Sequence, residues 1–431
     1  MKIYLHSIGC RLNHSEIETM GRQLLAAGHQ VVADAAEADK VIINTCAVTA
    51  EAARDARVLT RRLHKLNDTA DILLTGCYAT IAPRELARVE GATAVIPNSH
   101  KAQLVQQIDP LINPDLPVYE QEPLLREFHA GTTSRTRAFI KVQDGCDNKC
   151  TFCVTTIARG AGQSRHLGNV VAEVQALASA GYLEAVLTGV HLGSYGRDLG
   201  QPHGLRDLVA ALLTHTDMPR LRLSSLEPWE IADGFFGLWE NPRLLPHLHL
   251  PLQSGSERIL RLMARKTRPE SFRALVEEAR GHIPHLNLTT DLIVGFPGET
   301  EADFEESLAF TAAMNFSRIH AFSYSPRPGT AAATMPNHLP KHIKKERIGR
   351  VMAVAQELGR AYHEQYVGQT MPVLWESVLG ADEAGLRLAG YTDNYMRVLG
   401  HGTADDLKRI TAVHLTSADA DGLTGTVVPS P

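Results

Sequence analysis

The sequence predicts an α/β protein built in three parts. Residues 1–120 are expected to form an open parallel α/β domain, 132–365 a partial barrel of six β/α units, and 366–431 a small β-barrel. Two observations carry this prediction. Apolar runs alternate with helical patterns through the first two parts, which is typical of βα units and parallel sheets. The last part instead consists of short strand-like runs with Gly-rich turns.

Three apolar runs define the first part, and a cysteine closely follows each of them. The expected strands and helices span Lys2–Ser7, Val41–Asn44, Asp71–Thr75, Ser15–Ala27 and Ala50–Leu66. Cys10, Cys46 and Cys77 come after the three strands in turn. Open parallel sheets bind ligands outside the carboxyl ends of their strands. We therefore expect these three cysteines, the scattered triad, to converge at one edge of the sheet.

The pattern weakens over residues 101–134, which we interpret as a linker, and a second α/β series begins at Thr136. Its expected strands span Ala138–Val142, Ala185–Thr188, Arg220–Ser224, His247–Leu252, Asn287–Val294 and Arg318–Tyr324. Helices are expected at Gly168–Ala180 and Pro269–Gly281, and a basic helix at Lys341–Gln365. Six units are fewer than a closed eight-stranded barrel requires, so we expect an open barrel with its chemistry at the carboxyl ends of the strands.

The composition indicates a protein of the cytoplasm. The chain contains no run of about 18 uncharged apolar residues, which predicts no membrane-spanning helix and no membrane partner. It opens on a strand-like segment rather than a signal peptide. Six cysteines without secretory context favour a reducing compartment and metal or catalytic use. The net charge of −5 gives no overall sign of nucleic-acid binding, so any such function must rest on local features.

The second group of cysteines is a tight C-x3-C-x2-C cluster, which we call the tight triad. Cys146, Cys150 and Cys153 lie just beyond the first strand of the predicted open barrel. Closely spaced thiolates are the preferred ligands of iron–sulfur clusters. A zinc site would normally need a further pair of ligands, and none follows here. Three buried free cysteines are the plain alternative, but the flanking residues are polar and typical of a loop.

This spacing, with Phe152 before the last cysteine, resembles the signature of the radical S-adenosylmethionine (SAM) superfamily. The resemblance implies that the tight triad holds a [4Fe–4S] cluster and that SAM binds the fourth iron. Reductive cleavage of SAM would then give a 5′-deoxyadenosyl radical, with an electron donor protein as partner. The cofactor performs the difficult chemistry, and the protein positions it.

The scattered triad narrows the resemblance. Gly9-Cys10-Arg11-Leu12-Asn13, Asn44-Thr45-Cys46 and Thr75-Gly76-Cys77 resemble the N-terminal domain of the methylthiotransferases. Taken alone, cysteines after strands are ordinary packing residues. The resemblance implies a second [4Fe–4S] cluster on this triad that takes part in sulfur insertion, so that all six cysteines are catalytic metal ligands. It covers nearly the whole chain and includes the last part, which resembles a TRAM domain, an RNA-binding barrel.

Further segments fit the same family. Ala158-Arg159-Gly160 with Ser164-Arg165 resembles its R-G-x-x-R-S-R stretch, from which the chain departs at Gln163 and at Thr156. The resemblance also implies a set of residues that contact SAM, most of them at strand ends. This set comprises Phe152, Thr188, Gly189, Ser224, Gln253 and Ile293. Ordinary βα-turn chemistry is the alternative reading of those that are Gly, Ser or Thr.

Some tempting side chains are given plainer interpretations. His247 and His249 alternate with leucines in an expected strand, so we predict structural histidines rather than ligands. Tyr391 and Tyr395 are candidates either for stacking on bases or for packing. The basic residues within 341–350 are interpreted as a solvated helix face, with contact to RNA phosphates as the alternative.

The family divides by substrate, and three segments resemble the branch that modifies N6-threonylcarbamoyladenosine in tRNA. They are Gly9–Asn13, Tyr324–Thr330 and Gly390–Tyr395. The predicted reaction is methylthiolation of C2 of this adenosine, 3′ of the anticodon, with the tRNA anticodon stem-loop and SAM as partners. One feature points elsewhere. Residues from Tyr366 onward carry 4 Lys+Arg against 8 Asp+Glu, whereas phosphate contacts favour basic modules.

Two alternatives therefore stay open. The same chemistry could act on isopentenyladenosine in tRNA or on an aspartate of a ribosomal protein, as in the other branches. The chain could also be a catalytically silent RNA-binding protein whose cysteines hold zinc or no metal.

Overall fold

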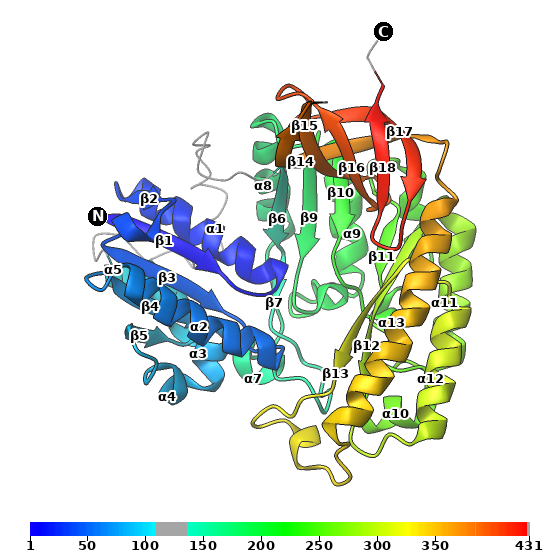
Figure 1. Cartoon of the computed structure of the whole chain (residues 1–431), viewed down its shortest axis with the longest axis horizontal. Coiled ribbons are helices and arrows are strands. Elements are labelled where there is room, and N and C mark those ends of the chain that lie inside the picture. Colours follow the sequence, from blue (N-terminus) through cyan, green and yellow to red (C-terminus); the bar gives the residue numbers. More distant parts are fainter. Residues whose placement is uncertain (109–135, 384, 429–431) are drawn as a thin grey trace.

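The computed structural model describes residues 1–108, 136–383 and 385–428 (Figure 1). It confirms the predicted fold class, with a parallel N-terminal sheet, an open barrel and a closed C-terminal barrel. The expected boundary between the first two parts, at residues 120 and 132, lies outside the described residues. In the part of the chain that the structure describes, no helix is long and apolar enough to cross a membrane.

The N-terminal sheet has five parallel strands, two more than predicted. In spatial order they are β2 (Gln30–Val32), β1 (Lys2–Ser7), β3 (Lys40–Thr45), β4 (Asp71–Gly76) and β5 (Ala92–Ile96). The two unpredicted strands are the short edge strands β2 and β5. Edge strands are only partly buried, so they lack the continuous apolar run that marks the three inner strands.

Helices cover both faces of this sheet, and buried aliphatic side chains fill the space between them (Figure 1). They are α1 (Arg11–Ala26), α2 (Ala50–Leu66), α3 (Cys77–Ile81), α4 (Pro83–Leu86) and α5 (Leu104–Ile108). Helix α1 begins four residues before the expected start at Ser15. Ser15 lies inside this helix, and its hydroxyl donates a hydrogen bond to the carbonyl of Phe139 at 3.0 Å. The predicted linker is wrong at its first residues, since Leu104 and Val105 are buried in the core.

The open barrel consists of two three-stranded parallel sheets that continue one another around a common inner face. The strands are β6 (Arg137–Lys141), β9 (Glu184–Thr188), β10 (Arg220–Leu223), β11 (His247–His249), β12 (Asn287–Val294) and β13 (Arg318–Ser323). Only isolated bridges such as Ser225 to His249 connect the two sheets. Pro246 and Pro251 flank β11, and proline cannot donate to a ladder. This explains why β11 is shorter than predicted.

The outer layer of the open barrel is helical, and short elements surround the tight triad. The helices are α7 (Thr155–Arg159), α8 (Leu167–Ser179), α9 (Gly204–His215), α10 (Glu257–Leu262), α11 (Pro269–His282), α12 (Glu301–Ala313) and α13 (Lys341–Glu364). A two-stranded ribbon of β7 (Gln143–Asp144) and β8 (Gln163–Ser164) encloses the loop that carries the tight triad.

Helix α12 begins with a capping box, which gives a testable contribution to stability. The Thr300 hydroxyl accepts a hydrogen bond from the backbone N–H of Asp303, and the Asp303 carboxylate accepts one from the backbone N–H of Thr300. Losing such a cap costs about 1 kcal/mol. We expect Thr300→Ala to lower the melting temperature of the open barrel by about 2–4 °C, measured by circular dichroism. Thr300→Ser retains the acceptor and serves as the control. An equal drop for both variants would contradict the capping role.

The basic start of α13 is held in part by ion pairs. The buried Arg347 pairs with Glu299 and Glu301, and Arg350 pairs with Glu301 and Glu305. The Lys344 ammonium donates to the carbonyl of Tyr324 at 2.9 Å. Arg347 and Arg350 thus anchor α13 near the start of α12, so these two arginines are occupied, whereas Lys341 and Lys345 of the same helix are exposed.

The C-terminal barrel closes on itself and sits over the ends where the strands of the open barrel begin (Figure 1). Its strands are β14 (Thr370–Asp382), β15 (Gly385–Thr392), β16 (Arg397–Gly402), β17 (Ile410–Ala418) and β18 (Leu423–Val427). Arg137 of β6 pairs with Glu376 of β14, at 2.9 Å between Nη2 and Oε2. Arg220 of β10 donates to the carbonyl of Pro372 at 3.1 Å. These contacts attach the C-terminal barrel to the base of the open barrel.

Candidate active site

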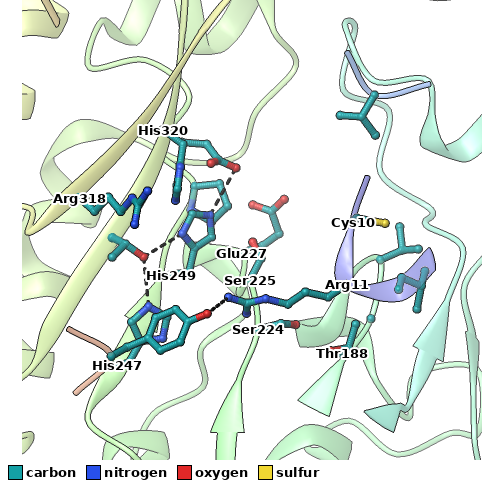
Figure 2. Close-up of a pocket in the computed structure, with 18 of the residues that line it drawn as sticks. Cys10, Arg11, Thr188, Ser224, Ser225, Glu227, His247, His249, Arg318 and His320 are labelled. Atoms are coloured by element: carbon teal, nitrogen blue, oxygen red, sulfur yellow. Dashed lines mark hydrogen bonds and ion pairs between the residues drawn. The ribbon is translucent and has the colours of Figure 1, made fainter. Parts of the chain in front are cut away.

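A cavity of about 650 Å³ lies where the N-terminal sheet, the open barrel and the C-terminal barrel meet. Each of the three parts contributes lining residues, among them Cys10, Ser224 and Tyr391. Figure 2 shows this central cavity, with Cys10 and Arg11 on one side and His249, Arg318 and His320 on the other. Its volume is in the range of small-molecule sites in proteins, about 300–1,000 Å³.

The scattered triad comes together at this cavity. Cys10 follows β1 and precedes α1, Cys46 follows β3, and Cys77 begins α3 directly after β4. All three side chains line the central cavity and none forms a disulfide. Because β1, β3 and β4 are parallel neighbours, their carboxyl ends lie at one edge of the sheet.

Glycine before a cysteine allows this close approach. Gly9 has a φ of +101°, and a Cβ built on it would lie 2.7 Å from the Cys46 sulfur. Gly76 has a φ of +99°, and a Cβ there would lie 2.3 Å from the carbonyl oxygen of Thr45. Side chains other than hydrogen are strained in this conformation. Glycine at both positions therefore lets the strand ends draw the thiols of the scattered triad together.

Arg159 connects the two triads. Its guanidinium donates to Glu16 at 2.8 Å, to Asp144 at 2.9 Å and to the side-chain oxygen of Asn13 at 2.8 Å. Glu16 and Asn13 belong to α1, whereas Asp144 precedes the tight triad. Burial works against the charged form, but the two carboxylates outweigh it and hold the pKa of Arg159 well above its usual value.

The Arg159 charge also acts on the thiols of the scattered triad. Burial raises the pKa of Cys10, and Arg159 opposes this rise. Burial raises the pKa of Cys46 to about 11, and there too Arg159 works in the opposite direction. A fixed cation beside buried sulfur atoms favours thiolates over thiols. At both cysteines burial is the larger effect, and Arg159 is the cation that offsets part of its cost to the thiolate.

The tight triad is held by the open barrel through two carboxylate-supported cations. The Arg265 guanidinium lies 3.9 Å from the Cys150 sulfur and binds both oxygens of Glu227, at 2.8 and 2.5 Å. On the other side His191 contacts Cys146 and lies 2.5 Å from the buried Glu230. Burial disfavours the charged imidazole, but the bonds to Cys146 and Glu230 outweigh it and raise the pKa of His191 to about 9.

The residues expected to contact SAM are largely gathered at the same cavity. Thr188, Gly189, Ser224 and Gln253 line it together with Phe152 and Cys153. Thr188 ends β9, and Gly189, Ser224 and Gln253 come after β9, β10 and β11, at the carboxyl ends of the strands. Ile293 is the exception, because it packs with Phe152 in a small apolar cluster and does not line the cavity. Cys146 and Cys150 are half-buried in the loop behind Cys153.

A continuous polar chain crosses the deep end of the cavity (Figure 2). The His249 ring lies 3.3 Å from Asp291 and 2.9 Å from the hydroxyl of Thr289, which in turn lies 3.3 Å from the His247 ring. His247 packs on Tyr395, at 4.8 Å between ring centres. Both histidines thus have partners, as predicted for structural histidines, yet both also line the cavity.

Tyr395 links the C-terminal barrel to the first helix. Its hydroxyl accepts a hydrogen bond from Arg11 at 2.9 Å, across 384 positions of sequence. Arg222 lies 4.4 Å from the Tyr395 ring centre, a typical cation–π geometry. Tyr391 stacks on Tyr395 at 4.8 Å. Both tyrosines thus line the cavity and pack on each other, whereas stacking on bases stays a prediction.

Comparison with known proteins decides the family. Residues 2–97 match the family described as uncharacterized protein family UPF0004, and residues 140–311 match the radical SAM superfamily. The threonylcarbamoyladenosine tRNA methylthiotransferase MtaB of Bacillus subtilis is 35% identical over 424 residues, covering 96% of this chain and 94% of that protein. This chain belongs to the radical-SAM methylthiotransferases.

A second relative and a solved structure also resemble this methylthiotransferase. The tRNA-2-methylthio-N(6)-dimethylallyladenosine synthase of Moorella thermoacetica is 34% identical over 431 residues, covering 97% of each chain. Among solved structures, the radical SAM methyltransferase TsrM of Kitasatospora setae, with tryptophan substrate and a SAM analogue, gives a TM-score of 0.57 at 16% identity. That match covers 77% of this chain and 75% of the other, and it supports the fold alone.

The residues present fit the iron–sulfur chemistry and the SAM of this family. Each triad offers three free thiols, and cations face both of them. In the described ranges no three His, Cys, Asp or Glu side chains converge on a single metal ion. Cluster thiolates bind separate iron atoms, so they need not converge in that way. The buried Ser224 hydroxyl finds no hydrogen-bond partner among the described residues, which suits a polar ligand such as SAM, since an unpaired buried hydroxyl is costly.

Sequence reasoning missed the cations that support the two triads. Arg159 was recognised only as part of a family stretch, and Arg265 and His191 were not considered. Arg265 lies 115 positions from Cys150, so no local pattern joins them. A sequence signal also existed for Asn13, an Arg159 partner, which stands in the segment around Cys10 and whose amide donates to the carbonyl of Thr45 at 3.1 Å.

Proposed function

We propose that this methylthiotransferase attaches a methylthio group to C2 of N6-threonylcarbamoyladenosine, 3′ of the anticodon in tRNA. The observation that carries the proposal is the opening of both cysteine triads into one cavity. Cys153 and all members of the scattered triad line it, so radical formation and sulfur insertion can share one substrate position. The relatives named above are tRNA methylthiotransferases of two branches, and the first is named for threonylcarbamoyladenosine.

The two triads are assigned different tasks in this proposal. Cys146, Cys150 and Cys153 would hold the cluster that binds SAM, and Cys10, Cys46 and Cys77 would hold a second four-iron cluster. When bound, the first cluster supplies the electron for reductive SAM cleavage, giving a radical able to take hydrogen from an unpolarised C–H bond such as adenine C2–H. Three thiolates leave one iron of each cluster without a protein ligand. The second cluster would supply the sulfur-transfer chemistry, and a second SAM would supply the methyl group.

The chain's own residues hold and balance these groups. Arg265, fixed by Glu227, offsets negative charge at Cys150, and Arg159 does so at the scattered triad. Ser224 and Thr188 present hydroxyls where SAM would lie. Enclosure by three parts of the chain restricts water, which protects a reactive radical from side reactions.

The cytoplasm is the proposed place of action, because tRNA is found there and free thiols persist in reducing compartments. An electron donor protein is the further partner that the chemistry needs.

Nucleoside mass spectrometry tests the substrate. The enzyme would be expressed in a bacterial strain lacking its own methylthiotransferases, and bulk tRNA nucleosides and ribosomal proteins would be compared. We expect 2-methylthio-N6-threonylcarbamoyladenosine to appear, and not to appear with a Cys150→Ala variant. Methylthiolation of isopentenyladenosine alone, or of a ribosomal protein alone, would overturn the assigned substrate. Absence of any methylthio product from reconstituted enzyme would favour the silent RNA-binding alternative.

A further inference from the structure

The wall of the cavity formed by β13 carries a guanidinium that the proposed reaction does not use. Arg318 begins β13, is exposed, and lines the cavity together with His320 from the same strand face. Residues two apart in a strand point to the same side. Arg318 forms no hydrogen bond or ion pair with any residue that the structure describes. Two of the three other arginines that line the cavity, Arg11 and Arg159, are in contrast bound to Tyr395 and to carboxylates.

Most carboxylates on the cavity wall are bound to residues other than Arg318. Asp291 lies against His249 at 3.3 Å, and Glu227 is bound by Arg265. Asp421, in the turn between β17 and β18, lines the cavity but forms no ion pair with Arg318. Figure 2 shows Arg318, His320 and His249 gathered on one side of the cavity, opposite Cys10. This side therefore presents hydrogen-bond donors and an uncompensated positive charge.

We propose that Arg318, assisted by His320, binds the carboxylate on the N6 substituent of the substrate nucleoside. The inference rests on the proposed function, since threonylcarbamoyl carries a carboxylate and isopentenyl does not. A guanidinium can grip a carboxylate through two parallel hydrogen bonds. An apolar isopentenyl group in the same place would strip water from the guanidinium and return no hydrogen bond, which disfavours binding. Arg318 thus acts as a specificity-determining residue.

A phosphate of the RNA backbone offers the same anionic chemistry, and matched probes separate the two sources. The reconstituted holoenzyme would be titrated with anticodon stem-loops of one sequence. They would carry N6-threonylcarbamoyladenosine, its carboxamide analogue without the charge, or unmodified adenosine. Fluorescence anisotropy gives the dissociation constants, and no turnover is needed. We expect wild type to prefer the carboxylate-bearing loop over the carboxamide by roughly tenfold to a hundredfold, as for hydrogen bonds to charged groups.

Substitutions at Arg318 then show whether this residue causes the preference for the carboxylate. Arg318→Gln should abolish it, and Arg318→Lys should retain part of it, because lysine keeps the charge without the planar fork. Arg360→Gln, which removes an exposed arginine of α13 outside the cavity, should leave all three affinities unchanged. An equal loss of affinity for all loops in Arg318→Gln would assign a phosphate contact and overturn the proposal. So would an unchanged preference in that variant.

A failure of this proposal can be told apart from a failure of the proposed function. The nucleoside profile of the wild type shows which adenosine is methylthiolated. If threonylcarbamoyladenosine is the product-forming substrate and Arg318→Gln still prefers the carboxylate, only the role of Arg318 is wrong. If wild type methylthiolates isopentenyladenosine alone, the assigned substrate is wrong.

Discussion

Replacing Cys10, Cys46 and Cys77 together by alanine is expected to abolish methylthiolation while SAM is still cleaved to 5′-deoxyadenosine. The physical reason is that separate parts of the chain support the two triads. The tight triad is held by His191 with Glu230 and by Arg265 with Glu227, all from the open barrel. Removing three thiols at the edge of the N-terminal sheet leaves those contacts in place.

Iron content and product analysis together measure this separation. Two four-iron clusters imply about eight iron atoms per reconstituted chain, and the variant should retain about four. Alanine at Cys146, Cys150 and Cys153 is the matched control, and it should lose both SAM cleavage and methylthiolation. Loss of SAM cleavage in the first variant, with its four iron atoms still bound, would show that the two triads do not divide the reaction as proposed.

Replacing Arg159 by methionine is expected to have the largest effect on stability. The substitution keeps much of the side-chain volume but leaves Glu16 and Asp144 without their shared cation. Removing one partner of a buried ion pair costs about 3–5 kcal/mol. We expect the lower end of this range, because Lys101 and Lys141 still lie 2.7 and 3.7 Å from Glu16.

The same variant should also lose iron from the scattered triad, since Arg159 supplies the positive charge beside those thiols. Urea unfolding and iron analysis of the reconstituted protein measure the two effects. Arg159→Lys retains the charge and should restore part of both. A destabilised Arg159→Met variant that still binds a full complement of iron would show that Arg159 is only a structural link.

Local sequence patterns were sufficient for elements whose apolar residues recur with a clear strand or helix pattern over their whole length. Lys2–Ser7, Asn287–Val294 and Ala50–Leu66 form as predicted, to the residue. The short edge strands β2 and β5 were missed because half-buried strands of three to five residues carry little pattern. The helix at Leu104 was missed because three apolar side chains in a five-residue segment do not show that a core lies beside it.

Local sequence patterns likewise revealed some residues of the active site and not others. The six cysteines could be found because their spacing and their positions after strands are local features. Their supporting cations could not be found, because Arg159 and Arg265 meet their partners only after the three parts of the chain pack together. The inward direction of Tyr391 and Tyr395 was equally hidden, since it depends on Arg137 and Arg222 from other strands.

The bond between Arg11 and Tyr395 has a consequence for how the protein is made. All six cysteines lie within the first 153 residues, so they leave the ribosome long before the turn that carries Tyr395. Domains fold in order during synthesis, starting from the N-terminus. The wall of the cavity contributed by the C-terminal barrel is therefore added last, after every iron ligand has left the ribosome. Nascent chains thus pass through a stage in which the scattered triad is present but the C-terminal barrel does not yet cover its side of the cavity.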